Sequence, residues 1–538
     1  MSTDKSGAPA SAAGGSTHHK SILKFTSILS LGTFTSRVLG FVRDIIFAQM
    51  LGTAAMADAF FVAFRIPNML RDLVGEGATN SALVPVLSEY KEKKDQRTVN
   101  EFLSVVVSWA FLILGGLTIV GIIFAPWIVR LIAPGFTADH EKLETTINLT
   151  RIMFPYLILI GFTAYSMGVL YTYQSFVIPA FSSCFLNVAL IVTTMIAGQH
   201  MNEAVYILAG GVLIGGVAQL AYQWIPLKNL GLRWQRPTTL RHDGALKMGK
   251  LLLPRIFGSV VYQSNIFVDT FCASLSAVVG AGGISAIYYS NRIIQFPLGI
   301  FGVAMASASL PTLSGFAARN DMNGFRSTIL FSLKNILFLL LPSSVLAMAL
   351  ATPVVRVLFE RGVFDQYSTS ITASALSYYA IGLASFGAVK IVVSAYHALQ
   401  DTATPVKVAG VCLLMNLVLN FILMVPLKIG GIALASSISG ILNVALLFYF
   451  LHKRIGGLAS EVLDFLWKMI VPLLVLMVTT LWGFNTFGTG NLFWGLAVAF
   501  LVGILSFLAV AWVFKIEQAI VLWRWVSQTL YKEVRGKR

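Results

Sequence analysis

Apolar stretches of about 20 residues recur along almost the whole chain, and each is long enough to cross a bilayer as an α-helix. Only 12% of the 538 residues are charged and 57% are hydrophobic, whereas soluble domains carry about 25% charged residues. A membrane-spanning segment must satisfy its own backbone hydrogen bonds, which favours helices. The sequence therefore predicts an all-α polytopic membrane protein rather than several soluble domains.

Fourteen transmembrane helices are expected. Their spans are 26–50, 57–74, 101–129, 146–171, 176–197, 204–226, 248–273, 284–310, 328–350, 370–397, 405–425, 430–452, 465–484 and 491–514. Lys and Arg gather in the loops after the second, sixth and twelfth spans, while the loops 52–57, 274–283 and 484–491 contain neither. By the positive-inside rule both termini are cytoplasmic. This topology also explains the net charge of +16 better than nucleic-acid binding does.

An internal repeat divides the chain. Four pairs recur 226 or 227 residues apart: Arg65 with Arg292, Pro85 with Pro311, Arg130 with Arg356, and Gln174 with Gln400. A duplicated six-helix unit enters the membrane in the same direction twice, which predicts two parallel lobes related by a pseudo-two-fold axis, with a cavity between them. The expected parts are a disordered cytoplasmic tail (1–22), a first lobe (23–228), a basic loop (229–247), a second lobe (248–453), two further helices (454–515) and a basic cytoplasmic tail (516–538).

Ionisable residues inside the expected spans are the main functional signal. Each costs about 2.5–3.5 kcal/mol at the centre of a membrane helix, so a cluster must face protein or water. In the first span Arg37, Gly40 and Asp44 share one stripe, with Arg43 beside it. The second span carries Asp58, Arg65, Arg71 and Asp72, a proline at Pro67 that should kink it, and a flexible Gly75-Glu76-Gly77 segment after it.

The arginines indicate a phosphate ligand. Arg292 follows Tyr288 and Tyr289 in the eighth span and is the repeat partner of Arg65. A guanidinium fork binds two phosphate oxygens and stays charged, so it suits a diphosphate better than lysine does. The alternative is that these arginines pair with neighbouring aspartates for packing, as Arg43 with Asp44 or Arg71 with Asp72. The three cysteines match no metal or redox spacing.

Several ungapped motifs carry a family resemblance. SRVLGFVRD, DAFFVAFRIPNMLRDLVGEGA, ALVPVLSEYK, YYSNRIIQFP and DTATPVK occur in this order, and the chain beyond its first 20 or so residues resembles the MurJ/MviN lipid II flippases of the MOP superfamily. The resemblance implies fourteen helices, in two six-helix lobes plus two helices whose groove holds a polyprenyl tail. It also implies a substrate, undecaprenyl-diphosphate bearing the peptidoglycan disaccharide-pentapeptide, which moves from the cytoplasmic to the periplasmic leaflet.

The resemblance also implies site residues. The essential cavity arginines fall on Arg37, Arg43, Arg71 and Arg292, the cavity acids on Asp44 and Asp58, and the gating region on Glu76, flanked by Gly75 and Gly77 and preceded by Pro67. Gln295 stands where some members have Glu, which puts a salt bridge there in doubt. Sodium is the one cofactor implied, at Asp269, Asn416, Asn420 and Ser436. Asn420 replaces an aspartate of the sodium pattern, so ordinary helix-to-helix hydrogen bonds are the alternative.

These observations predict a carrier that works by alternating access in the bacterial inner membrane. Its partners would be lipid II, membrane lipids and cell-wall synthesis enzymes, with no nucleic acid, and it would act as a monomer. The alternatives are a flippase for another diphosphate-linked oligosaccharide, a MATE-like cation-coupled antiporter, a scaffold, or an enzyme acting on the same lipid. The sequence contains none of the H-E-x-x-H, G-x-S-x-G or Asp-rich motifs expected of such an enzyme.

Overall fold

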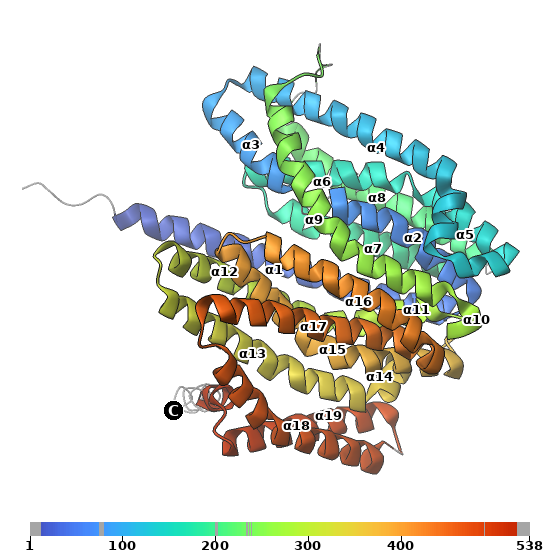
Figure 1. Ribbon diagram of the computed structural model, residues 1–538. Coiled ribbons are helices and arrows are strands. Elements are labelled where there is room, and N and C mark those ends of the chain that lie inside the picture. The colour runs from blue at the N-terminus through green and yellow to red at the C-terminus, as the bar shows by residue number, and fades with distance from the viewer. Residues whose placement is uncertain are drawn as a thin grey trace, which may run out of the picture. The chain divides into compact units, whose positions relative to one another are not determined.

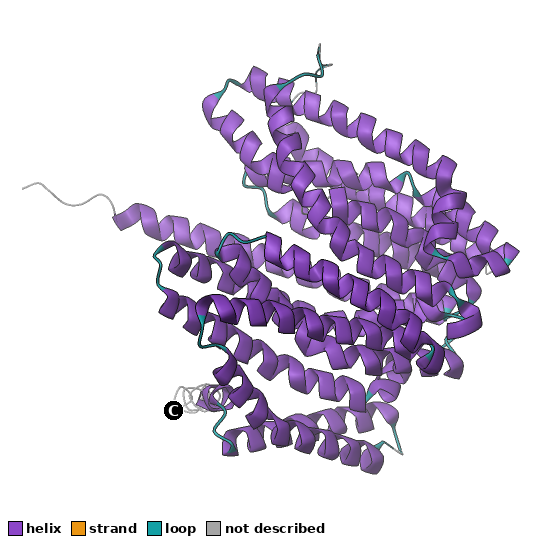
Figure 2. Ribbon diagram, in the orientation of Figure 1, coloured by secondary structure: helices purple, strands orange, loops and turns teal. Residues whose placement is uncertain are grey.

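The computed structural model describes residues 12–74, 80–198, 203–232, 235, 237, 239–488 and 490–524; side chains are not described for 12–30, 70–74, 80–81 and 253–262. The described residues form helices joined by short loops, without a strand among them (Figure 2). The all-α architecture predicted from the apolar stretches is confirmed.

In the first half of the chain, the described residues form helices α1 to α8 (Figure 1). They are α1 (Ala12–Leu51), α2 (Ala55–Val74), α3 (Asn80–Lys93), α4 (Gln96–Ile132), α5 (His140–Met153), α6 (Tyr156–Thr172), α7 (Val177–Ala197) and α8 (Ala204–Asn229), with a 3-10 turn η2 (Pro134–Ala138) before α5. Helix α1 begins at Ala12, inside the segment expected to be a disordered tail. Once a long helix has nucleated, each further residue adds a backbone hydrogen bond, so α1 extends even through Gly14 and Gly15, which are poor helix formers on their own.

The second half contains the remaining helices. They are α9 (Asp243–Ser274), α10 (Ser276–Val279), α11 (Gly283–Pro297), α12 (Val303–Ala318), α13 (Met322–Ala349), α14 (Ala351–Phe359), α15 (Gln366–Ala398), α16 (Ala403–Leu427), α17 (Ile429–Ile455), α18 (Ala459–Phe487) and α19 (Leu492–Val513). A π-helical turn η4 (Leu298–Gly302) joins α11 to α12 directly after Pro297. Asp321, Asp365 and Asn491 cap α13, α15 and α19 by accepting hydrogen bonds from first-turn amides.

Each of the fourteen expected spans coincides with helical residues. Eleven spans in the described part of the chain are long and apolar enough to cross a membrane, counting α5–α6 and α11–α12 as one span each. The three expected spans outside that set are α1, α2 and α9. Parts of these three helices lie outside the residues whose side chains are described. The three helices carry predicted site residues, among them Arg43, Asp58 and Asp269.

The helix boundaries repeat with the period found in the sequence. Gln96 and Met322 begin α4 and α13, Thr172 and Ala398 end α6 and α15, and each pair is 226 residues apart. Gln174 and Gln400 both adopt a left-handed backbone, with φ of 59° and 58°. After each glutamine the next amide donates to a carbonyl five residues earlier, from Ser175 to Leu170 and from Asp401 to Tyr396. This shared helix ending gives the duplication a structural counterpart.

The chain divides into two compact units. Unit 1 comprises residues 1–47, 63–128 and 144–259, and unit 2 comprises 48–62, 129–143 and 260–538. In unit 1, α7 packs against α8, α8 against α6, and α6 against α3. An apolar cluster that includes Leu83, Phe102 and Val169 fixes α3 to α4 and α6. Lys247 of α9 forms an ion pair with Glu89 of α3 and holds the pKa of that carboxyl below its ordinary value.

Unit 2 is organised around α15, which packs against α11, α12, α13 and α17. Most of the buried residues of α15 are small, including Ala375, Gly382 and Ala388, so neighbouring helices approach closely, as is usual in membrane bundles. Helices α18 and α19 pack against each other, and α18 packs on α13 (Figure 1). The two short segments 48–62 and 129–143 come from the first half but belong to this unit.

Candidate substrate-binding site

Arg43 and Asp44 on α1 form a buried ion pair. Arg43 is only 4% exposed and Asp44 is fully buried. Arg43 Nε and Nη2 donate to Asp44 Oδ1 at 3.0 and 2.7 Å, and Nη1 donates to Asn187 Oδ1 on α7 at 3.0 Å. This is the packing pair that the sequence left as an alternative for Arg43. A pair hydrogen-bonded in this way positions α1 and has little capacity left for an anionic ligand.

Asn187 fixes α7 to two turns of α1. Its Nδ2 donates to the carbonyl of Ser36 at 3.0 Å while its Oδ1 accepts from Arg43. Gly40 lies between these two contacts, and a Cβ placed there would meet the Asn187 amide at 3.6 Å. This is an ordinary van der Waals distance, so α7 does not require a glycine here, and the expected role of Gly40 stays a prediction.

The expected stripe on α1 does not share one environment. Arg37 is exposed, whereas Asp44 on the same stripe is buried against Arg43. Residues seven apart lie on one face but about 10.5 Å apart along the axis, so they meet different neighbours. Arg37 is thus the α1 arginine whose side chain is accessible to a ligand.

The other predicted residues of the first half are only partly described. Arg65 is half-buried on α2, and Pro67 lies inside α2, which continues to Val74. Arg71 lies within the same helix, but its side chain is outside the described set. Gly75, Glu76 and Gly77, the expected gating segment, lie outside the described residues.

Arg292 is supported by Tyr288, one turn earlier on α11. Its Nη2 donates to the hydroxyl of Tyr288 at 3.1 Å, and its guanidinium carbon lies 5.1 Å from the centre of the Tyr288 ring. Phe61 of α2 stacks on that ring with the two centroids 4.0 Å apart. A tyrosine that supports the arginine in this way fixes the direction of the guanidinium group.

Asp58 of α2 contacts the first turn of α11 and forms a buried ion pair with Lys142. Its Oδ2 is 2.9 Å from Lys142 Nζ, and its Oδ1 accepts from the Ser285 amide at 2.9 Å and the Ser285 hydroxyl at 2.7 Å. Asp58, Lys142 and Ser285 are 2%, 7% and 0% exposed. The carboxylate therefore caps the positive end of α11 while Lys142 neutralises it.

Further contacts join the segments just before α2 and just after α4 to residues of the second half. All of them lie within unit 2. We call this set, together with the Asp58 contacts, the far-end closure. Its other members are Thr53 Oγ1 with Ser368 Oγ at 2.8 Å, the Val363 amide with the Gln49 carbonyl at 2.9 Å, and the Gly135 amide with Ser274 Oγ at 3.1 Å. Gly282, the residue before α11, has φ of 75°, and a Cβ there would lie 2.3 Å from the Thr53 carbonyl. This closure needs glycine at that position.

The residues of the implied sodium site do come together. Asp269 on α9, Asn416 and Asn420 on α16 and Ser436 on α17 are mutually hydrogen-bonded. Asn416 and Asn420 are 1% and 0% exposed. These bonds also fit the alternative of helix-to-helix hydrogen bonding.

Sequence reasoning missed three polar residues. Lys142 lies in a stretch that is mostly acidic, and Asn187 is an ordinary amide, so neither stands out without its distant partner. Lys390 is different, because it is a cationic side chain inside the apolar span α15, and the rule applied to the other intramembrane charges would have found it. It is half-buried, and its Cδ would lie 3.7 Å from a Cβ on Gly302.

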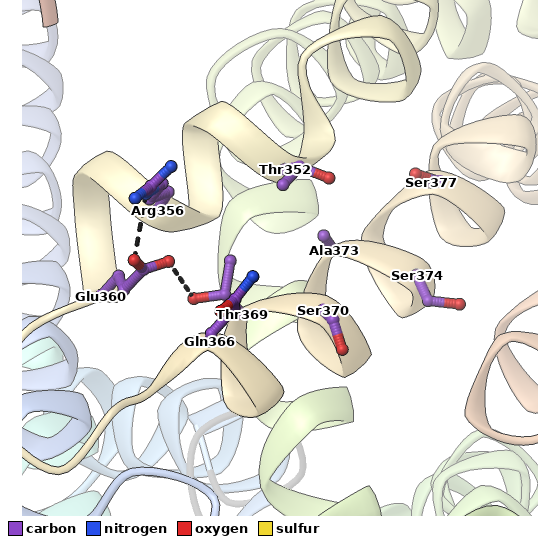
Figure 3. Close-up of a pocket in the computed structure, with 9 residues that line it drawn as sticks. All are labelled: Thr352, Arg356, Glu360, Gln366, Thr369, Ser370, Ala373, Ser374 and Ser377. Carbon is purple, nitrogen blue, oxygen red and sulfur yellow. Dashed lines mark hydrogen bonds and ion pairs between the residues drawn. The ribbon is translucent and has the colours of Figure 1, made fainter. Parts of the chain in front are cut away.

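A pocket of about 360 Å³ lies between α14 and α15 (Figure 3). Its lining is polar, and the predicted site residues are not part of it. It consists of Thr352, Arg356, Glu360, Gln366, Thr369, Ser370, Ala373, Ser374 and Ser377. Arg356 and Thr369 both bind Glu360 (Figure 3), so the charged part of this pocket is internally balanced.

Known proteins resemble this chain in both sequence and fold. The family model described as lipid II flippase MurJ matches residues 47–505. The lipid II flippase MurJ of Burkholderia cenocepacia is 35% identical over 441 residues, which cover 80% of this chain and 84% of the relative. The probable lipid II flippase MurJ of Vibrio cholerae is 34% identical, and the match covers 91% of this chain and 96% of that relative.

Solved structures agree. A structure titled lipid II flippase MurJ, inward closed conformation, has a TM-score of 0.76 at 30% identity and covers 90% of this chain and 98% of its own. An inward-facing MATE multidrug transporter of the MOP superfamily has a TM-score of 0.67 at 15% identity, covers 79% of this chain and 96% of its own, and shares the fold. On the family model and these relatives, this multi-span membrane protein belongs to the MurJ family of lipid II flippases.

Proposed function

We propose that this chain carries lipid II from the cytoplasmic to the periplasmic leaflet of a bacterial inner membrane, as a transporter rather than an enzyme. Family membership supports the substrate, and arginines on membrane-spanning helices supply the groups that bind a diphosphate. The charge pattern of the loops supports cytoplasmic termini. The chain acts as a monomer, with its substrate, membrane lipids and cell-wall synthesis enzymes as partners.

Arginines of both halves bind the diphosphate in this proposal. Arg37 and Arg71 contribute from the first half and Arg292 from the second. Arg37 supports the proposal because its side chain is exposed. Arg292 supports it because a guanidinium group held by the Tyr288 ring loses little freedom when it binds two oxygens. Arg43 and Asp44 are positioning residues that hold α1 against Asn187.

Release to the periplasm requires the far-end closure to open. Asp58 and Lys142 lie in two segments of the first half that belong to unit 2 together with α11, and in this proposal the two segments leave α11 together. The bonds that break are those from Ser285 to Asp58. Lys142 thus keeps the Asp58 carboxylate paired throughout, which avoids the large penalty of leaving a lone charge in a poorly hydrated place.

Tyr288 connects this opening to the ligand. Phe61 stacks on one side of the Tyr288 ring, and Arg292 binds the tyrosine hydroxyl. Arg292 is also two turns after Ser285 on α11. A diphosphate that binds Arg292 therefore acts on the same helix whose first turn Asp58 caps. A ligand shifts such an equilibrium only by its difference in affinity for the two states.

The lipid tail stays in the hydrocarbon layer beside α18 and α19. Both helices expose large apolar side chains to the membrane, among them Leu474, Val478 and Leu505. A surface of this kind matches acyl or prenyl chains and leaves the polar head to the arginines. The gating role proposed for Glu76, Gly75 and Gly77 belongs to the same cycle, at its cytoplasmic end.

The proposal is tested by depleting the protein from cells and measuring labelled lipid II that an impermeant probe reaches from outside. We expect the outer-leaflet pool to fall while the inner pool accumulates. Parallel measurement of another undecaprenyl-diphosphate oligosaccharide separates this substrate from its relatives, and export of an organic cation tests the antiporter alternative. An unchanged outer pool of lipid II after depletion would contradict the proposal.

A further inference from the structure

Four polar side chains in the second half form a closed ring of hydrogen bonds. Asn420 Nδ2 donates to Asp269 Oδ1 at 3.1 Å and to Asn416 Oδ1 at 3.0 Å. Asn416 Nδ2 donates to Ser436 Oγ at 3.2 Å, and Ser436 Oγ donates to Asp269 Oδ2 at 2.8 Å. The ring joins α9, α16 and α17, and both asparagines are buried.

A hard cation at this place would need the same oxygens. Sodium binds carboxylate, amide and hydroxyl oxygens that converge on one point. Here the two hydrogens of the Asn420 amide already point at two of those oxygens, and both Asp269 oxygens accept a hydrogen bond within the ring. A side-chain amide has two such hydrogens, so the Asn420 nitrogen uses its full donor capacity on the oxygens that a cation would need.

The other end of the Asn420 amide strengthens this argument. Asn420 Oδ1 is buried and accepts no hydrogen bond in the described part of the chain. Turning the amide over would give Oδ1 to the ring, but it would then face Asp269 Oδ1 and Asn416 Oδ1. Three oxygens so close together repel one another unless a cation lies among them. Sodium binding and this amide orientation therefore exclude each other.

We infer that the Asp269 cluster is a sodium-independent hydrogen-bond network, in which the Asn420 amide replaces the cation that a second carboxylate at this position would recruit. Asp269 is the one carboxylate of the ring, and both of its oxygens accept hydrogen bonds there. The network holds α9 to α16 and α17 without a bound ion. The energy for transport then comes from a source other than sodium binding at this cluster.

The test measures sodium binding directly. Purified wild-type protein and Asn420→Asp are heated across an approximately thousand-fold range of NaCl, with ionic strength held constant by choline chloride. An ion that binds only the folded state raises the melting temperature as its concentration rises. We expect no sodium-dependent shift for the wild type and a rise of about 2 °C or more for Asn420→Asp. Asn335→Asp adds a carboxylate on α13, where the native amide donates to the Phe331 carbonyl, and should behave like the wild type.

A wild-type melting temperature that rises with sodium but not with choline would overturn the inference. A lack of response in Asn420→Asp, with folded protein in hand, would overturn the role given to Asn420. The wild-type measurement decides the first point even if the variant fails to fold. Because no lipid II is present, the outcome is independent of whether the chain transports lipid II.

Discussion

Arg292→Ala is expected to lower lipid II transport by at least about 30-fold, because removing one partner of a buried charge-assisted contact costs about 2–5 kcal/mol. Arg292→Lys should fall between the wild type and alanine, since lysine keeps the charge but loses the fork that binds two oxygens. The rate is measured in cells that depend on the variant, with the amount of membrane-inserted protein determined in parallel.

Arg319→Ala is a matched control. Arg319 lies next to Phe316 with its guanidinium carbon 5.1 Å from the ring centre, the same distance as between Arg292 and Tyr288. It follows the end of α12, in the loop before α13. Its loss should leave transport unchanged. Equal transport by Arg292→Ala and Arg319→Ala, with both inserted at wild-type amounts, would rule out Arg292 as a ligand for the substrate.

Lys142→Ala is expected to destabilise the protein by about 3–5 kcal/mol, because it leaves the buried Asp58 carboxylate without its charge partner. The double variant Asp58→Asn with Lys142→Ala should recover most of that loss, since an amide oxygen still accepts from Ser285 and no charge remains. Thermal unfolding of the purified variants gives the size of the effect, and complementation gives its consequence for transport.

An exposed pair provides the comparison. Arg356 and Glu360 form a 3.0 Å ion pair, but the Arg356 side chain is 57% exposed. Exposed pairs of this kind contribute little, so Arg356→Ala should leave the melting temperature almost unchanged. If the melting temperature of Lys142→Ala is no lower than that of Arg356→Ala, the buried Asp58 carboxylate does not depend on Lys142. The proposed opening of the far-end closure is then wrong.

The helices and the duplication could be predicted from the sequence because both are recorded locally. Apolar length identifies a membrane helix regardless of its neighbours, and the repeat pairs lie at a constant spacing that the helix boundaries confirm. Even the left-handed corner at Gln174 and Gln400 falls on a pair noted from the sequence. These features depend on residues that are close together or copied, so no tertiary information is needed.

The pairing of the charged residues could not be predicted in the same way. Arg43 had a neighbouring carboxylate, and the sequence left open whether it would bind that carboxylate or a ligand. Asp58 on α2 pairs with Lys142 on α5, 84 residues later in the chain, and no local sequence pattern indicates that contact. The cavity expected between the lobes and the gating role of Glu76 stay predictions.

The most direct test of the central claim uses purified protein in liposomes that contain lipid II. A membrane-impermeant enzyme that cleaves the lipid II head is added outside, and the cleaved fraction is followed over time. If this chain carries lipid II, the cleaved fraction in liposomes with the wild-type protein will exceed the fraction of lipid II that the outer leaflet holds at the start. In liposomes with Arg292→Ala it will not. Wild-type liposomes that expose no more than the Arg292→Ala ones, with both proteins folded, would contradict the account.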